Sequence, residues 1–266
     1  MSDGPIRVGG YSPANDEAGF RGDVTLEDGL AQSLNTVSVR LLLQAGGPRA
    51  VAAVAHRLGI ADALPDNASL ALGTGEVGVL EMASAYATFF NGGYLVAPVA
   101  MEGLEADHRP VALPHPAATR VVDPELAGMM AQMMGAVVSR GTGRAAAVPG
   151  RVVAGKTGTT QDFRDAWFIG SVGPDIIAVW LGNDDNRPMR NVAGAAYRPG
   201  CFTTLPWKYD RRRPSNAGQA PDRPVGWAAT PASRSSARHR RLQRQATITT
   251  HARGPREEGR LRRGPT

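Results

Sequence analysis

Residues 151–172, RVVAGKTGTTQDFRDAWFIGSV, decide the fold prediction. Paired β-branched residues favour a strand over Arg151 to Ala154, and the largely apolar run Ala166 to Val172 favours a second strand. Gly173-Pro174-Asp175 forms a tight turn, and the apolar run Ile176 to Leu181 then predicts a third strand. The stretch therefore predicts an antiparallel meander.

The sequence upstream of the meander has helical periodicity and helix start and stop signals. We expect helices at Thr25 to Ser33, Val37 to Leu43, Pro48 to Gly59, Val79 to Phe90 and Pro124 to Gly141. Helices followed by a run of strands indicate an α+β fold rather than a doubly wound sheet.

The last of these helices carries an apolar stripe at helical spacing. Its members are Leu126, Met129, Met130, Met133, Met134, Val137 and Val138. Four methionines also suit a metal site or an adaptable groove, but the spacing is that of a helix face packed on a core. We therefore expect this face to be buried.

Composition is that of an ordinary globular chain, with 42% hydrophobic and 20% charged residues, and it points to one domain plus extra segments. Cys201 is the only cysteine, which excludes a disulfide framework. The five histidines show no metal-ligand spacing, so we expect no metal and no cofactor.

The net charge of +6 divides unevenly along the chain. Residues 1–197 hold 14 basic against 20 acidic residues, whereas residues 198–266 hold 16 against 4. The basic segment is rich in arginine and proline without strand or helix periodicity, and we expect it to be disordered. The alternative is a nucleic-acid-binding arm, but we expect no nucleic-acid partner.

Gly150 and the run Gly155-Lys156-Thr157 satisfy the spacing of a nucleotide-binding P-loop. A P-loop needs a strand before its first glycine and a helix beginning at the lysine. Here the spacer favours a strand, and the residues after Lys156 favour a strand end and turn. The nucleotide-binding alternative therefore has the wrong context.

A second interpretation combines Lys156-Thr157-Gly158 with Ser33-Leu34-Asn35. Serine acyl-transferases that act on penicillin-like substrates use Ser-x-x-Lys, Ser-x-Asn and Lys-Thr-Gly, and here the Ser-x-Asn lies between two helices and Lys-Thr-Gly on a strand. Taken alone, Ser33 and Asn35 also suit helix caps, and Lys156 suits an exposed strand lysine. The order and context of the two motifs favour the enzyme site.

Four longer stretches resemble the bifunctional class A penicillin-binding proteins of the 1A type. They are residues 9–15 (GGYSPAN), 25–40, 81–93 and 155–170, and the resemblance runs from about residue 3 to Val192. It implies a penicillin-binding/serine β-lactamase-like transpeptidase fold, an antiparallel sheet flanked by helices, over residues 1–194. We expect the fold to be incomplete at both ends.

The resemblance implies cross-linking of peptidoglycan through attack of a serine on a D-Ala-D-Ala stem peptide, with β-lactams as inhibitors. It makes Ser33 a proton relay, Asn35 a holder of the substrate's amide backbone and Lys156 a positive charge near Ser33. Thr157 and Thr159 would bind the substrate carboxylate, the Thr159 N–H would donate to the oxyanion, and Gly158 would let the substrate approach the strand.

The nucleophile motif is missing from this sequence. The only lysines are Lys156 and Lys208, preceded three residues earlier by Val153 and Leu205, so no Ser-x-x-Lys occurs. The family places that motif and its first two sheet strands upstream, which makes the upstream part of the same domain an expected partner. We expect no acyl-enzyme from this polypeptide alone.

The family is anchored in the membrane with its catalytic domain outside the cytoplasm, whereas this sequence shows neither a signal peptide nor a run long enough to span a bilayer. Residues 195–202 (AAYRPGCF) also depart from the family ending. Permitted codons for them, shifted by one base, encode Gly-Gly-Leu-Pro-Ala-Arg-Met-Phe, which fits that ending. We therefore expect residues 195–266 to be an out-of-frame tail.

Overall fold

The computed structural model describes residues 1–16, 19–101, 104–106, 108–111, 113, 116–189 and 244–251. Its elements in chain order are α1 (Leu26–Ala31), α2 (Asn35–Gln44), α3 (Pro48–Arg57), η1 (Ala68–Leu72), α4 (Val79–Phe90), β1 (Tyr94–Leu95), β2 (Leu104–Ala106), β3 (Arg109–Val111), β4 (Thr119–Arg120), α5 (Pro124–Arg140), η2 (Arg144–Ala146), β5 (Val153–Thr159), η3 (Gln161–Phe163), β6 (Asp165–Val172), β7 (Asp175–Gly182) and β8 (Arg244–His251).

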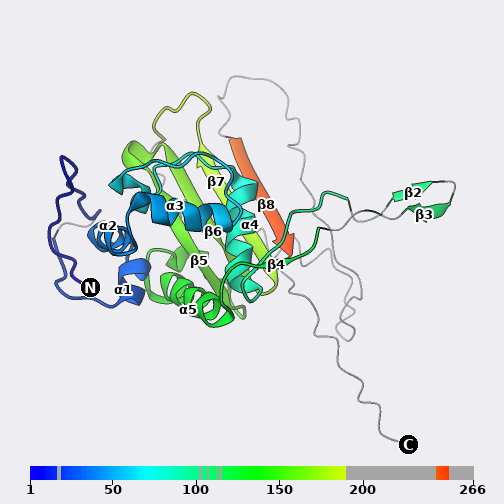
Figure 1. The fold of residues 1–266 in the computed structure, drawn as a ribbon, viewed down its shortest axis with the longest axis horizontal. Helices are drawn as coiled ribbons and strands as arrows, with labels where there is room; N and C mark the ends of the chain where they lie inside the picture. The colour runs from blue at the N-terminus through cyan, green and yellow to red at the C-terminus, as the bar shows by residue number, and fades with distance from the viewer. Residues whose placement is uncertain are drawn as a thin grey trace, which may run out of the picture.

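A four-stranded antiparallel sheet in the order β5-β6-β7-β8 lies at the centre of the fold (Figure 1). The predicted meander and the α+β class are therefore confirmed. β5 continues to Thr159, beyond the predicted end at Ala154. Its whole length pairs with β6, and this ladder keeps the glycines and threonines after Lys156 extended.

Strand β8 contradicts the prediction that the basic segment contains no strand. Its backbone pairs with the whole of β7, from Asp175↔His251 to Gly182↔Arg244. The segment TITT at residues 247–250 is β-branched throughout, and the edge of β7 offers backbone groups to any extended segment that reaches it. The rest of the predicted tail, residues 190–243 and 252–266, lies outside the described residues.

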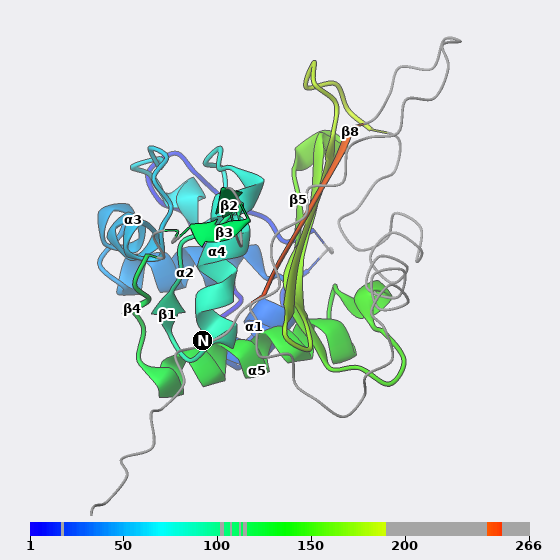
Figure 2. The same cartoon turned by 90° about the vertical axis from the view of Figure 1, so that its right-hand side faces the viewer.

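The sheet is covered on both faces. Ile176 and Ala178 of β7 pack with α4, whereas the alternate residues Ile177 and Val179 share a cluster with Val138 of α5. Burial on both faces explains why β7 is apolar from Ile176 to Leu181. Figure 2, which views the sheet on edge, shows α4 on one side and α5 running below from that side toward the other.

The five predicted helices are present. Thr25 and Asp123 are the N-caps of α1 and α5, and their side chains accept hydrogen bonds from the N–H groups of Asp28 and Glu125. Cap residues therefore located the starts of these two helices, because a cap acts on adjacent backbone groups.

The predicted burial of the α5 stripe is wrong for the first half of the helix. Leu126 and Met129 are 58% and 59% exposed, whereas Met134, Val137 and Val138 are buried. Only the second half of α5 joins the buried cluster formed by the sheet and η2. Periodicity sets which side chains share a face, but packing decides how much of that face is covered.

Two small sheets complete the described fold, and the sequence did not predict them. β1 pairs with β4, and β2 pairs with β3 around His108, whose φ is 59°. Strands of two or three residues are too short to show a period.

Candidate active site

Ser33 follows α1 in a left-handed backbone conformation, with φ 56°. Its N–H donates to the Leu30 carbonyl at 3.2 Å, and the Leu34 N–H donates to the Gly29 carbonyl at 2.9 Å. This is the Schellman ending of a helix, in which the left-handed position usually belongs to glycine. A serine here carries a backbone strain of about 1 kcal/mol.

The helix-cap alternative for Ser33 and Asn35 is not supported. The N-cap residue of α2 is Leu34, which makes no side-chain cap bond, and Asn35 is the first residue inside the helix. The Ser33 hydroxyl instead accepts a hydrogen bond from Lys156 Nζ at 3.0 Å. This contact joins residues 123 positions apart.

Lys156 lies in the middle of β5, so the P-loop alternative, which needs a helix there, is not supported either. Besides Ser33, its Nζ donates to the Thr157 carbonyl at 2.9 Å and approaches Thr157 Oγ1 at 3.4 Å. Burial lowers the pKa of Lys156 to about 8, and the negative charge of Asp16 opposes that shift. Its amine can therefore exchange a proton near neutral pH.

The pleat of β5 separates the Lys-Thr-Gly residues into two sets. Lys156 and Gly158 face one side of the sheet, and Thr157 and Thr159 face the other. A Cβ added to Gly158 would lie 3.2 Å from the Cβ of Trp167, so this position has little room for a larger residue.

Alternate residues of β5 are hydrogen-bonded to β6, and this alternation gives the direction of the backbone groups of β5. The Gly173 N–H donates to the Val152 carbonyl and the Thr160 N–H to the Asp165 carbonyl, which fixes the bonded pairs at even-numbered residues of β5. The N–H and C=O groups of Thr157 and Thr159 therefore point away from β6, toward the outer edge of the sheet. Among the described residues no strand pairs along that edge.

Asn15 fixes the start of α2 from the preceding loop. Its Oδ1 accepts hydrogen bonds from the N–H groups of Asn35 at 2.9 Å and Thr36 at 3.4 Å. The Asn35 side chain in turn donates from Nδ2 to the Ala14 carbonyl at 2.7 Å. Asn15 thus acts as an N-cap that is distant in sequence, and it positions Asn35 beside Ser33.

Asp3 holds this loop in place from a fully buried position. Its carboxylate accepts hydrogen bonds from Thr36 Oγ1 at 2.6 Å, Asn15 Nδ2 at 2.8 Å and the Arg21 N–H at 2.8 Å. Burial raises the pKa of Asp3, but these three hydrogen bonds outweigh it and hold the pKa below its ordinary value. No sequence motif predicted a role for Asp3 or Asn15, because both act on backbone and side chains far along the chain.

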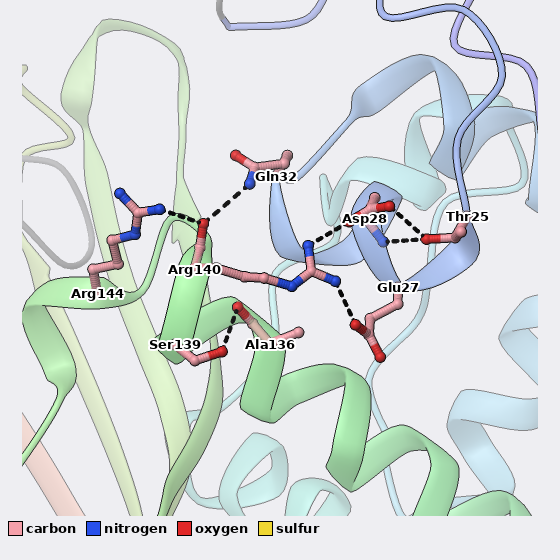
Figure 3. Close-up of polar contacts among 8 residues, drawn as sticks. All are labelled: Thr25, Glu27, Asp28, Gln32, Ala136, Ser139, Arg140 and Arg144. Atoms are coloured by element: carbon pink, nitrogen blue, oxygen red, sulfur yellow. Dashed lines mark hydrogen bonds and ion pairs between the residues drawn. The ribbon is translucent and has the colours of Figure 1, made fainter.

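The C-terminal end of α5 is bound to α1 by an ion-pair cluster (Figure 3). The Arg140 guanidinium contacts the carboxylates of both Glu27 and Asp28. Gln32 Nε2 donates to the Arg140 carbonyl at 3.2 Å. Helix α1, which Ser33 follows, is therefore fastened to the segment that leads into β5.

Thr142, just after α5, links α1 to the Lys-Thr-Gly strand. Its N–H donates to the Ala31 carbonyl at 3.0 Å, and its Oγ1 lies 2.7 Å from Thr157 Oγ1. The approach is so close that a Cβ on Gly141 would lie 2.1 Å from the Ala31 oxygen. The sequence showed Gly141 only as a helix stop, and nothing in it pointed to Thr142.

Of the residues predicted for the site, Ser33, Lys156 and Thr157 are joined directly by hydrogen bonds. Asn35 lies two positions from Ser33 at the start of α2, and Gly158 and Thr159 follow on β5. In the described part of the chain no cluster of three metal-ligating side chains occurs.

A serine at the end of one helix, bonded to the lysine of a Lys-Thr-Gly strand at a sheet edge, defines a class of protein. It is the class of serine acyl-transferases that act on penicillin-like substrates. The chain matches the family model for the penicillin-binding protein transpeptidase domain over residues 2–196. The chain therefore belongs to the penicillin-binding protein transpeptidase family.

Sequence relatives are class A proteins, as the resemblance predicted. Penicillin-binding protein 1A of Neisseria meningitidis is 38% identical over 208 residues, which cover 72% of this chain and 26% of that protein. The Aquifex aeolicus protein of the same name is 38% identical over 193 residues, with the same two coverages. The chain thus spans about a quarter of the length of these relatives.

Solved structures agree with the fold. The PonA1 protein from Mycobacterium tuberculosis, in complex with penicillin V, has a TM-score of 0.66 at 29% identity over 78% of this chain and 60% of that one. Penicillin-binding protein 1A from Haemophilus influenzae has a TM-score of 0.68 over 96% of this chain and 45% of that one. At 24% identity the second likeness shows the fold alone.

Proposed function

We propose that residues 1–189 form the part of a D-alanyl-D-alanine transpeptidase domain that binds the carboxylate end of a peptidoglycan stem peptide. The observation that carries this proposal is the 3.0 Å hydrogen bond from Lys156 Nζ to Ser33 Oγ. The serine occupies a strained position that suits glycine, and its hydroxyl caps no helix. Strain of this kind persists where a function requires it.

Proton relay is the role that this contact supports for Ser33. With the pKa of Lys156 at about 8, its amine can give a proton to Ser33 or take one from it near neutral pH. Ser33 would pass a proton from the nucleophile side to the leaving D-alanine amine. Asn35, two residues on, would hold the amide backbone of the donor peptide.

The open edge of β5 supports the substrate-binding roles. An extended peptide can add along such an edge, where Gly158 allows close approach. The Thr157 and Thr159 hydroxyls lie on one side of the strand and would bind the peptide carboxylate there. Lys156 extends from the other side, but its Nζ comes within 3.4 Å of Thr157 Oγ1 and so brings its charge to the same place. The Thr159 N–H points to the edge and would donate to the oxyanion, a contribution of roughly 3 kcal/mol in other enzymes.

Acyl transfer also needs a nucleophile, and these 266 residues contain no Ser-x-x-Lys. The upstream part of the same domain would supply it, and β-lactams would acylate that serine. We therefore expect binding, but no covalent chemistry, from this polypeptide. We also propose that the protein acts in cell-wall synthesis outside the cytoplasmic membrane. No helix in the described ranges is long and apolar enough to span a bilayer.

Peptide binding to the full chain tests the proposal. The sequence contains only two lysines, so labelling lysine with ¹⁵N at Nζ gives two NMR signals. The substitution Lys208→Arg leaves the signal of Lys156 alone. We expect a peptide ending in D-Ala-D-Ala to shift this signal saturably, because its carboxylate would lie beside the ammonium. The matched peptide ending in L-Ala-L-Ala is the control, and equal responses to the two peptides would reject the proposal.

A labelled penicillin tests the missing nucleophile. We expect no label on the denatured full chain after incubation, because the hydroxyl of Ser33 has a relay position and no serine stands three residues before a lysine. A stable adduct would show that another residue acts as the nucleophile, and peptide mapping would identify it.

A further inference from the structure

The Thr142 hydroxyl faces the site from outside the predicted motifs. Thr142 is exposed, and its Oγ1 lies 2.7 Å from Thr157 Oγ1, so either hydroxyl can donate to the other. The segment that carries it is fixed to α1 by the bond from the Thr142 N–H to the Ala31 carbonyl. Its place relative to Thr157 is therefore set by the tertiary fold.

Lys156 limits the orientations of the Thr157 hydroxyl. Its Nζ lies 3.4 Å from Thr157 Oγ1, and a positive charge draws the lone pairs of that oxygen toward itself. The Thr157 proton then points away from Lys156. If Thr142 donates to the second lone pair, the Thr157 oxygen accepts two hydrogen bonds and keeps its single proton for a ligand.

We propose that Thr142 is a positioning residue, which donates to Thr157 Oγ1 and thereby directs the Thr157 hydroxyl proton toward the substrate carboxylate. This inference rests on the proposed function, because Thr157 must bind the carboxylate for its orientation to matter. It extends the site to a residue that lies outside both sequence motifs. The contact to Ala31 also ties this orientation to α1, the helix that precedes Ser33.

A misdirected hydroxyl presents its oxygen instead of its proton to an anion. Without the Thr142 hydroxyl, the Thr157 proton can turn toward the place that the Thr142 oxygen occupied, or toward solvent. The Thr157 hydroxyl must then rotate back when the carboxylate binds. A charge-assisted hydrogen bond to a carboxylate would be weakened, while contacts to the rest of the peptide would stay. The effect should therefore depend on the charge at the peptide terminus.

The experiment compares a D-Ala-D-Ala peptide with its C-terminal amide, using dissociation constants for the full chain. Wild type should prefer the free acid. Thr142→Val, which keeps the shape but lacks the hydroxyl, should lose about tenfold of this preference. Thr142→Ser should restore it, and the affinity for the amide should stay unchanged in both variants.

A double-mutant cycle shows whether Thr142 acts through Thr157. Adding Thr142→Val to Thr157→Val should change the acid preference no further, because the hydroxyl to be directed is already absent. Equal melting temperatures of the single variants and wild type would show that the fold is intact.

The outcomes separate the two proposals. If wild type binds the acid no better than the amide, the proposed carboxylate site fails and the role of Thr142 fails with it. If wild type prefers the acid and Thr142→Val keeps that preference, or loses affinity for acid and amide alike, only the role of Thr142 is overturned. The same holds if the two substitutions reduce the preference additively.

Discussion

Ser33 combines a left-handed backbone conformation with a side-chain contact to a distant strand. Its left-handed φ of 56° closes α1 as a glycine would, yet its side chain is needed to reach Lys156. The backbone cost is about 1 kcal/mol, and the hydrogen bonds of the Schellman ending hold the conformation. The strain and the contact with Lys156 have the same origin, because this backbone directs the hydroxyl toward β5.

Two substitutions at Ser33 separate the backbone from the hydroxyl. Ser33→Gly and Ser33→Ala both remove the contact with Lys156, but only glycine relieves the left-handed conformation. We expect Ser33→Gly to be more stable than Ser33→Ala by about 1 kcal/mol in urea unfolding. Equal stabilities would show that Ser33 is not held in this conformation.

Lys156 should make stability depend on pH above neutrality. Burial lowers its pKa to about 8 from an ordinary 10.5, so between these values the unfolded chain holds a proton that the folded chain has lost. Its contribution to the free energy of unfolding therefore rises with pH from about 8 to about 10.5, and below pH 8 the cost of burying the ammonium is fully present.

Urea unfolding at several pH values measures this contribution. Subtracting the profile of Lys156→Gln should leave the rise between about pH 8 and 10.5, because glutamine does not titrate. Direct titration of the labelled Lys156 amine should give a midpoint near pH 8. A midpoint near 10.5 would mean that the amine is solvated.

At the scale of elements, α5 has two unlike halves. Its first half exposes Leu126 and Met129, whereas its second half is buried against the sheet and ends in Arg140. The ion pairs of Arg140 with Glu27 and Asp28 lie near the surface, so each contributes little alone. Their importance is geometric, because they fasten the helix before Ser33 to the segment before β5.

Removing Arg140 tests this junction. We expect Arg140→Gln to lower the melting temperature, and the loss should shrink in about 1 M salt, where the screening length falls to about 3 Å. Arg49→Gln is the matched control, since its 2.7 Å pair with Asp66 is exposed and joins neither α1 nor α5. If the fall in melting temperature does not depend on salt, or if Arg49→Gln causes an equal fall, the junction has no special role in stability.

The whole molecule is organised around a sheet with two different edges. No strand among the described residues pairs with the outer edge of β5, whereas β8 covers the edge of β7. An uncovered edge is a template for pairing with another chain. We therefore predict that β8 keeps β7 from pairing with another chain, through a ladder made by backbone groups, and takes its place as the edge strand.

Truncation before and after β8 tests that role. We expect a chain ending at residue 243 to self-associate through β7, and a chain ending at residue 251 to behave as the full chain does. Size-exclusion chromatography with light scattering measures both. If the shorter chain keeps the mass of the longer one, the edge of β7 does not need β8.

The sequence by itself determined the five helices, the three-strand meander, the α+β class and the family. These features depend on neighbouring residues: caps bind adjacent backbone groups, and periods of 3.6 and 2 place side chains on one face. The order of Ser-x-Asn and Lys-Thr-Gly along the chain, together with the family resemblance, also assigned both motifs to one site.

Only the tertiary structure decided which distant groups meet. It brought Ser33 within 3.0 Å of Lys156, gave Asn15 its role as a distant N-cap, placed Thr142 against Thr157 and paired β8 with β7. It also left Leu126 and Met129 uncovered, although their spacing resembles that of a core. Contacts of this kind depend on how elements pack across the whole chain, and no local period or cap records that packing.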